Sequence, residues 1–300
     1  MLFKVLKRAL ALLGLATAAF AAPQPAVAPT ALARPALWEV SDQDTTIYLF
    51  GTIHLLPDNY QWRTPVIDKA IANSNSLYVE TIVDPKNPEP LIMAMRTLGY
   101  GNGLPPLADR IDPAKRPLLE AAIAKSGIPR AYFDKMETWA AAFTLLGVQY
   151  KEIGLGGENG PEQALRDTFG AAGKPVGQLE TNAQQLGFFD VLPESAQRSL
   201  LEGAIEPTKT ATVDFSEMLR GWANGDVEAI ARTFNHDLAE TPALRETLLD
   251  RRNANWSRWI EQRMAQPGVV FLAVGAGHLA GLKSVQSLLE HDGYRVRRIQ

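Results

Sequence analysis

Apolar residues form short runs near both ends of the chain, whereas the middle follows a helical period. Near the N-terminus, apolar runs at 37–40 and 46–50 flank a polar cluster at 41–44, which predicts a β-hairpin. Near the C-terminus, an apolar run at 269–274 leads into a glycine-rich turn, which predicts a buried strand. We therefore expect β/α segments at both ends of the chain.

A strand, a helix and a second strand are predicted over residues 48–80. Pro65 suits the first position of a helix that ends near 73–75, and a short strand at 77–79 ends at Glu80, which outlines a parallel crossover. Residues 91–265 are mostly helical in period, with one short strand at 176–180. Further helices are predicted at 114–125, 137–149, 161–172, 184–205, 213–222, 227–238, 243–265 and 282–290, a loop at 154–160, and a last strand at 294–299.

The expected fold is α/β (α+β), with one β-sheet formed by the N- and C-terminal segments and a largely helical middle. The 300 residues are enough for one large core. We expect residues 37–300 to form a single discontinuous domain.

The first residues are typical of a secretory signal peptide. Lys4, Lys7 and Arg8 precede an apolar run at 9–20, and a small-x-small cleavage pattern follows at 19–21. The run is near twelve residues, short of the roughly 20 that a membrane span needs. We expect cleavage of residues 1–21, with an uncleaved anchor as the alternative, and a Pro/Ala-rich spacer at 22–36. The protein is then periplasmic or extracellular, without a stable membrane span.

Charge and cysteine content exclude several classes of function. Loss of three positive charges with the leader changes the net charge from −3 to −6, which argues against nucleic-acid binding. The chain has no cysteine, so it has no thiol nucleophile and no thiolate metal ligand. Any metal would be held by His, Asp, Glu or water.

Four polar residues lie at the predicted strand ends. Two of the chain's four histidines sit in matching G-x-x-H turns after apolar strands. Carboxyl ends of parallel strands line the crevice where open α/β sheets bind ligands. Imidazole and carboxylate suit Zn, Mn or Co, and such an ion would activate water and polarise a carbonyl. The four candidates are His54, Glu80, Glu180 and His278.

Each signal has a plainer structural explanation. A single G-x-x-H is weak, although two copies strengthen it, and a glutamate at a strand end can simply cap the next turn. Arg252 and Asn253 lie on a predicted helix with Trp256. That helix is either an ordinary amphipathic helix with Trp in the core, or it orients the carboxylates or holds a substrate carbonyl.

The motifs together resemble a known family. The matching pieces are FGTIHLLP at 50–57, LYVE at 77–80, GKPVGQLET at 173–181, RRNANW at 251–256 and VGAGHLAG at 274–281. In this order and spacing the chain resembles the TraB/PrgY/GumN family, which includes the TIKI metalloproteases. That family is distantly similar to erythromycin esterases and ChaN-like proteins, so the resemblance implies their fold.

The resemblance also implies roles for single residues. His54 and His278 look like metal ligands, and Glu80 looks like a ligand or the general base. Glu180, Arg252 and Asn253 look like the supporting shell. One departure is Ser284, which stands where the pattern H-L-x-G-x-x-G has its last glycine. It puts in doubt the packing of the following helix or the shape of the pocket wall.

These observations predict an exported, divalent-metal-dependent hydrolase that uses Mn, Co or Zn, with a peptidase favoured. A metal-activated water would attack a carbonyl, a glutamate would take the proton, and Arg252 or Asn253 would steady the oxyanion. The alternatives are a non-catalytic envelope protein that binds a peptide, a metal or a metal cofactor, and an esterase for a small molecule. The sequence names neither the substrate, nor the metal, nor the oligomeric state.

Overall fold

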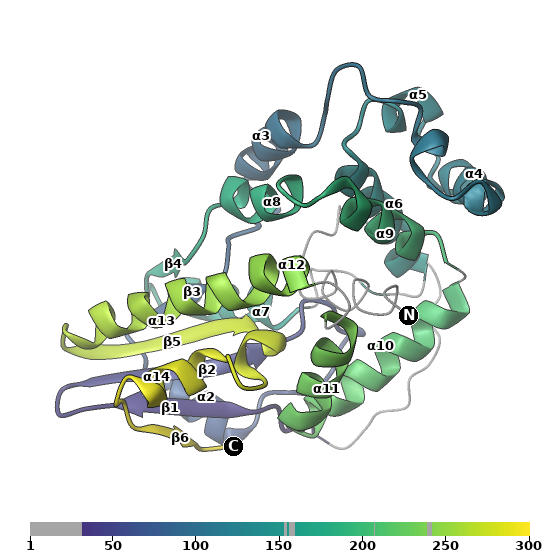
Figure 1. Cartoon of the computed structure of the whole chain (residues 1–300). Helices are drawn as coiled ribbons and strands as arrows, with labels where there is room; N and C mark the ends of the chain where they lie inside the picture. The colour runs from purple at the N-terminus through teal and green to yellow at the C-terminus, as the bar shows by residue number, and fades with distance from the viewer. Residues whose placement is uncertain (1–31, 153–154, 156–159, 207, 239–241) are drawn as a thin grey trace.

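A computed structural model describes residues 32–152, 155, 160–206, 208–238 and 242–300 (Figure 1). The predicted leader, most of the spacer and most of the predicted loop at 154–160 lie outside the described residues. The end of the predicted spacer packs against the fold. Ala33 and Ala36 are buried, and the Ala33 N–H donates to the carbonyl of Gln61. Their small side chains allow this close packing.

Both ends of the chain contribute to one sheet, as predicted. The strand order within the described residues is β4-β3-β5-β2-β1-β6. The pairs β4–β3, β3–β5 and β5–β2 are parallel, whereas β1 is antiparallel to both β2 and β6. The expected fold class is therefore confirmed. The strands are β1 Leu37–Ser41, β2 Thr45–Thr52, β3 Ser76–Val79, β4 Val176–Gln178, β5 Gly268–Gly275 and β6 Val296–Arg298.

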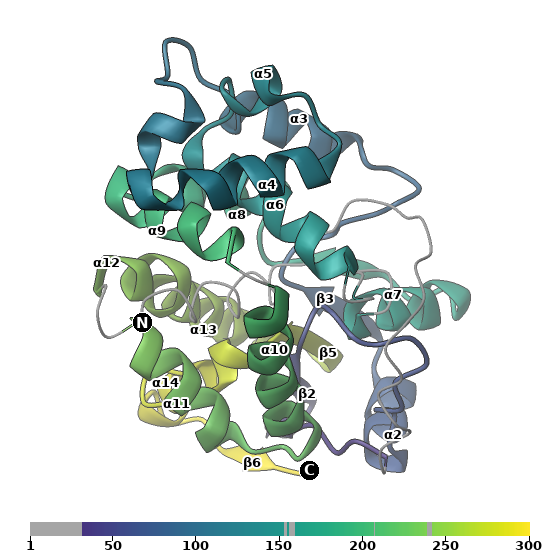
Figure 2. The same cartoon turned by 90° about the vertical axis from the view of Figure 1, so that its right-hand side faces the viewer.

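Helices cover both faces of the sheet, and others form a separate helical lobe. Figures 1 and 2 show α3, α4, α5, α6, α8 and α9 gathered in this lobe above the sheet. The helices are α2 Pro65–Asn73, α3 Glu89–Leu98, α4 Arg116–Ser126, α5 Arg130–Phe133, α6 Thr138–Glu152, α7 Pro161–Ala171, α8 Asn182–Asp190, α9 Glu194–Ala204, α10 Thr208–Ala223, α11 Val227–Leu238, α12 Pro242–Arg245, α13 Arg251–Met264 and α14 Val285–His291. Across the described residues, no helix has the length and apolar content needed to cross a membrane.

The central strands are apolar on both sides because the two faces of the sheet are both covered. Alternate residues of β5 belong to different cores, as the two-residue period of a strand requires. Val270 and Leu272 pack in the core that contains Trp256 of α13. Phe271 packs in the other core, with its ring centroid 6.3 Å from that of Phe169 of α7. The result is a sheet between two helical layers.

The predicted crossover is present, with one addition. Strands β2 and β3 are joined by α2, but β5 lies between them in the sheet. The pairing of β5 with β2 runs from Gly268 opposite Thr45 to Gly275 opposite Thr52. The two G-x-x-H segments, far apart in the sequence, thus leave the sheet side by side.

Some helix predictions differ from the structure, three of them for an identifiable reason. The single helix expected at 184–205 is wrong: α8 and α9 are separate, because the residue before Pro193 disfavours helical geometry. The helix expected at 243–265 contains a π turn, Glu246–Asp250, between α12 and α13. The helix expected from 282 begins at Val285, and Ser284 caps it by accepting the N–H of Ser287 at 3.4 Å. This cap accounts for the serine at that position.

Candidate active site

The four polar residues predicted at strand ends meet at one edge of the sheet. His54 lies two residues after β2, Glu80 directly follows β3, and Glu180 lies two residues after β4. His278 lies in a 3₁₀ turn, Ala276–Leu279, that directly follows β5. Because these four strands run parallel, their carboxyl ends share one edge. All four side chains are buried there.

Arg252, on the first turn of α13, connects three of these four residues. Its Nε donates to Glu180 Oε1 at 2.9 Å, and its Nη2 donates to Glu180 Oε2 at 2.8 Å and to Glu80 Oε2 at 2.6 Å. Its Nη1 donates to the Leu248 carbonyl at 3.2 Å and to His278 Nε2 at 3.0 Å. A guanidinium has five N–H hydrogens, and these five contacts use them all.

A π turn directly precedes α13, and the Arg251 N–H donates to the carbonyl of Glu246, five residues earlier. The Leu248 carbonyl, which lies in this turn, accepts Arg252 Nη1, because a carbonyl oxygen has two lone pairs. This contact ties the guanidinium to the start of its own helix.

Glu80 is an ionised carboxylate held from three sides. Besides Arg252, it accepts Gln185 Nε2 at 3.0 Å and the backbone N–H of Gly275 at 2.6 Å. Burial alone would raise the pKa of Glu80, but the positive charges around it, chiefly Arg252, lower this pKa to about 2. Glu80 is therefore a weak base at neutral pH. For Glu180 the balance is different, because burial raises its pKa although the charge of Arg252 opposes the shift.

His278 is neutral, and both its ring nitrogens are occupied. Asn253 Nδ2 donates to the Lys283 carbonyl at 2.7 Å, so its Oδ1 faces His278 Nδ1, at 2.6 Å, as an acceptor. His278 then carries its hydrogen on Nδ1 and accepts Arg252 at Nε2. Burial first and the charge of Arg252 second lower the pKa of His278 to about 3. Its ring packs on Trp256, with centroids 4.3 Å apart.

His54 has a different partner, Glu162, which the sequence did not indicate. His54 Nδ1 lies 2.5 Å from Glu162 Oε1, and Thr52 Oγ1 donates to the same oxygen at 2.5 Å. Burial lowers the pKa of His54, but the negative charges of Glu162 and Glu80 outweigh burial and the net pKa is raised. Nε2 of His54 is buried and has no hydrogen-bond partner among the described residues.

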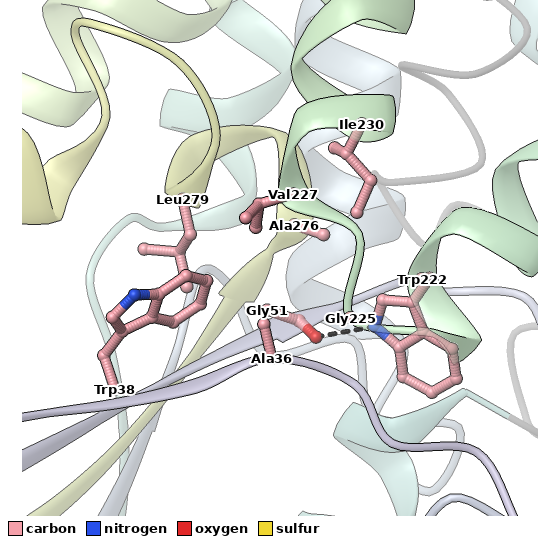
Figure 3. A pocket seen from close by; sticks show the side chains of 9 residues that line it. All are labelled: Ala36, Trp38, Gly51, Trp222, Gly225, Val227, Ile230, Ala276 and Leu279. Atoms are coloured by element: carbon pink, nitrogen blue, oxygen red, sulfur yellow. Dashed lines mark hydrogen bonds between the residues drawn. The ribbon is translucent and has the colours of Figure 1, made fainter. Parts of the chain in front are cut away.

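The two G-x-x-H turns touch each other through small residues. A side chain at Gly51 would lie 3.2 Å from Ala276 Cα, so glycine allows the two turns to approach closely. Figure 3 shows the small apolar hollow beside this contact, where Trp222 Nε1 of α10 donates to the Gly51 carbonyl at 2.7 Å. The hollow is too small to hold a substrate, so it is a packing gap.

A sequence model of the TraB/PrgY/gumN family matches residues 36–298, which is nearly all of the described chain. The chain belongs to the TraB/PrgY/gumN family. Neither the curated proteins nor the solved structures gave a match. The matched range contains both G-x-x-H turns and the RRNANW segment, so the family predicted from these motifs is confirmed.

The metal that the family resemblance implies does not fit the donor atoms as they are arranged. The predicted ligands are His54, His278 and Glu80. Arg252 already supplies a positive charge to Glu80 Oε2 and a hydrogen to His278 Nε2. Within the described residues, no three His, Asp or Glu side chains form a group that could hold a metal ion. The metal therefore stays a prediction of the resemblance.

Of the predicted supporting residues, the structure brings Glu180, Arg252 and Asn253 into the cluster. Asn253 contacts His278, and Arg252 contacts both glutamates. Sequence reasoning missed Glu162 and Gln185. Glu162 carried one signal, an acidic residue in the first turn of a helix that begins with proline. Nothing in the sequence placed that turn beside His54.

Proposed function

We propose that this chain is an exported hydrolase that adds water to the carbonyl group of a peptide bond, with a small-molecule ester as the other candidate substrate. One observation carries the proposal. Within a buried cluster of charged residues at four strand ends, His54 Nε2 is a ring nitrogen without a hydrogen-bond partner among the described residues. A buried polar atom without a partner is costly, and sites that bind or react are where such atoms are kept.

In this proposal His54 is the general base. Neutral His54 takes a proton from a water molecule at Nε2 while the water oxygen attacks the carbonyl carbon. The protonated ring then gives that proton to the leaving amine or alcohol, so that the enzyme ends in its starting state. General acid–base catalysis of this kind contributes typically 10²–10⁴-fold to the rate.

The other charged residues of the cluster are assigned to positioning. Arg252 has no N–H left for a substrate oxygen, because all five have protein acceptors. Both polar atoms of the Asn253 side chain are likewise in use. These contacts support a role in fixing Glu80, Glu180 and His278 rather than a direct contact with the oxyanion.

The test is hydrolysis of a peptide panel and an ester panel by the exported protein purified from cells. Wild type, His54→Gln and His291→Gln are compared, since His291 is exposed at the end of α14 and serves as the matched control. We expect turnover by wild type and by His291→Gln, and a loss of 10²-fold or more in His54→Gln.

Each assay is repeated with a chelator and with added Mn, Co or Zn, which tests the metal predicted from the resemblance. Turnover that persists in the chelator supports His54 as the base. Turnover that requires one of the ions contradicts that role and favours His54 as a ligand. If wild type hydrolyses neither panel under any condition, the hydrolase proposal is wrong and a non-catalytic binding protein takes its place.

A further inference from the structure

Glu162 contacts the ring of His54 from helix α7, which lies outside all the sequence motifs described above. It lies on the first turn of α7, 108 positions after His54 in the sequence, and its side chain is 16% exposed. The carboxylate Oε1 lies 2.5 Å from His54 Nδ1, on the side of the ring opposite the unpartnered Nε2. The contact thus occupies Nδ1 of the ring and leaves Nε2 available for a water molecule or a substrate.

Two further features fix this carboxylate. Thr52, fully buried at the end of β2, donates its hydroxyl to the same Oε1 at 2.5 Å. Gly160, which caps α7, lies against the carbonyl of His54 so closely that a side chain there would clash with that backbone atom. The start of α7 therefore lies against the backbone of the first G-x-x-H turn, and the side-chain contacts of Glu162 hold it there.

The consequence concerns which ring nitrogen carries the hydrogen. A carboxylate accepts hydrogen bonds and does not donate them, so His54 must present an N–H at Nδ1. In the neutral ring the lone pair is then on Nε2, the atom without a protein partner. The carboxylate also fixes the rotation of the ring, because the bond holds Nδ1 in one direction.

We infer that Glu162 is a positioning residue that holds His54 with its hydrogen on Nδ1 and its lone pair on Nε2, aimed at the reacting water. This inference rests on the proposed function, since the water belongs to that proposal. Thr52 acts on His54 indirectly, because its hydroxyl orients the carboxylate of Glu162. Neither residue touches the substrate, so their replacement lowers kcat and leaves KM nearly unchanged.

The experiment uses a graded set of variants of the full exported protein. Glu162→Gln keeps the size and an acceptor oxygen, Glu162→Ala removes the acceptor, and Thr52→Val removes only the outer hydroxyl. Asp167→Asn, at an exposed position of the same helix, is the matched control. We expect kcat to fall about 10²-fold or more in Glu162→Ala, by less in Glu162→Gln, and by a few-fold in Thr52→Val. The control matches wild type.

A second readout does not depend on turnover. With ring-¹⁵N-labelled histidine, NMR reports which nitrogen of His54 carries hydrogen, and His54→Gln assigns the signal among the four histidines. We expect a protected Nδ1–H signal in wild type, retained in Glu162→Gln and lost in Glu162→Ala. If wild type turns over no substrate, the proposed function fails, but this signal still decides whether Glu162 fixes the ring.

Three results overturn the inference. One is an Nδ1 without hydrogen in wild type. Another is wild-type kcat with an unchanged Nδ1–H signal in Glu162→Ala. The third is a rise in KM at constant kcat, which assigns Glu162 to substrate binding. If Glu162→Ala does not fold, as circular dichroism would report, Glu162→Gln and Thr52→Val are judged by the same criteria.

Discussion

The two turns share the G-x-x-H-L pattern, but their histidines have opposite surroundings. They leave the sheet from paired parallel strands, with Thr52 opposite Gly275. His54 faces a carboxylate, its pKa is raised, and its Nε2 has no partner among the described residues. His278 lies between an amide and a guanidinium, and its pKa is lowered to about 3.

The difference shows that the motif sets the position of a ring but not its chemistry. Each turn brings a histidine to the sheet edge, and Gly51 allows the two turns to pack closely because a side chain there would crowd Ala276. What the ring can do is then decided by the helix that faces it. Helix α7 brings the carboxylate of Glu162 to the first ring, whereas α13 brings Asn253 and Arg252 to the second. The first ring suits proton transfer and the second suits structural support.

The largest effect is expected from removing the charge that surrounds the second ring, that of Arg252. Arg252→Met removes the cation shared by Glu80 and Glu180 and leaves two buried carboxylates without it. Breaking a buried ion pair by removing one partner costs about 3–5 kcal/mol. We expect the free energy of unfolding, measured by urea denaturation, to fall by that amount.

Arg251→Met is the control for this prediction, because Arg251 is the exposed neighbour on the same helix. An exposed substitution away from packed features changes stability by less than about 0.5 kcal/mol. Equal losses in the two variants would show that Arg252 is not the centre of the cluster.

Much of this cluster could be predicted from the sequence because strand ends are predictable. A strand-like run followed by a polar side chain marks a strand end, and parallel strands bring such ends together. His54, Glu80, Glu180 and His278 all follow such runs. The RRNANW segment drew attention to Arg252 and Asn253, although the pattern left open whether they formed an ordinary helix face.

The rest depended on tertiary contacts that sequence periodicity does not encode. The first turn of α7 lies beside His54 because Gly160 permits a close backbone approach, and no sequence spacing reports that approach. The π turn before α13 has no signature in the apolar pattern either. The break between α8 and α9 is different, since Pro193 is visible in the sequence and its effect on the preceding residue is enough to predict the break.

A smaller effect is expected from the amide that holds the second ring. Asn253→Ala leaves the His278 Nδ1–H and the Lys283 carbonyl without their partner. An unsatisfied buried group costs about 1–3 kcal/mol, which lowers the free energy of unfolding by that amount. Asn255→Ala, at an exposed position of the same helix, controls for the change in helix propensity. A loss no greater than in the control would mean that the second ring is held by Arg252 and packing alone.

The smallest effect is a shift in the pH dependence of turnover, and it separates the two rings directly. A base works only when neutral, and the pKa of His54 is raised above the ordinary 6.5 by Glu162 and Glu80. The acid limb of kcat is therefore expected to have its midpoint above pH 6.5, so that at pH 6.5 kcat is at most about half of its plateau. His278, with a pKa near 3, adds no limb between pH 5 and 9.

The pKa shifts of His54 and His278 also change the free energy of unfolding, in opposite directions with pH. The raised pKa of His54 contributes stability that is present below pH 6.5 and is lost as pH rises through the folded-state pKa. The lowered pKa of His278 contributes stability that is present above pH 6.5 and is lost as pH falls toward 3. The measurement is kcat from pH 5 to 9, with urea unfolding of wild type and His278→Gln over the same range. A rate that is flat down to pH 5 would contradict His54 as the base, because only a ring in surroundings like those of His278 stays neutral that far down.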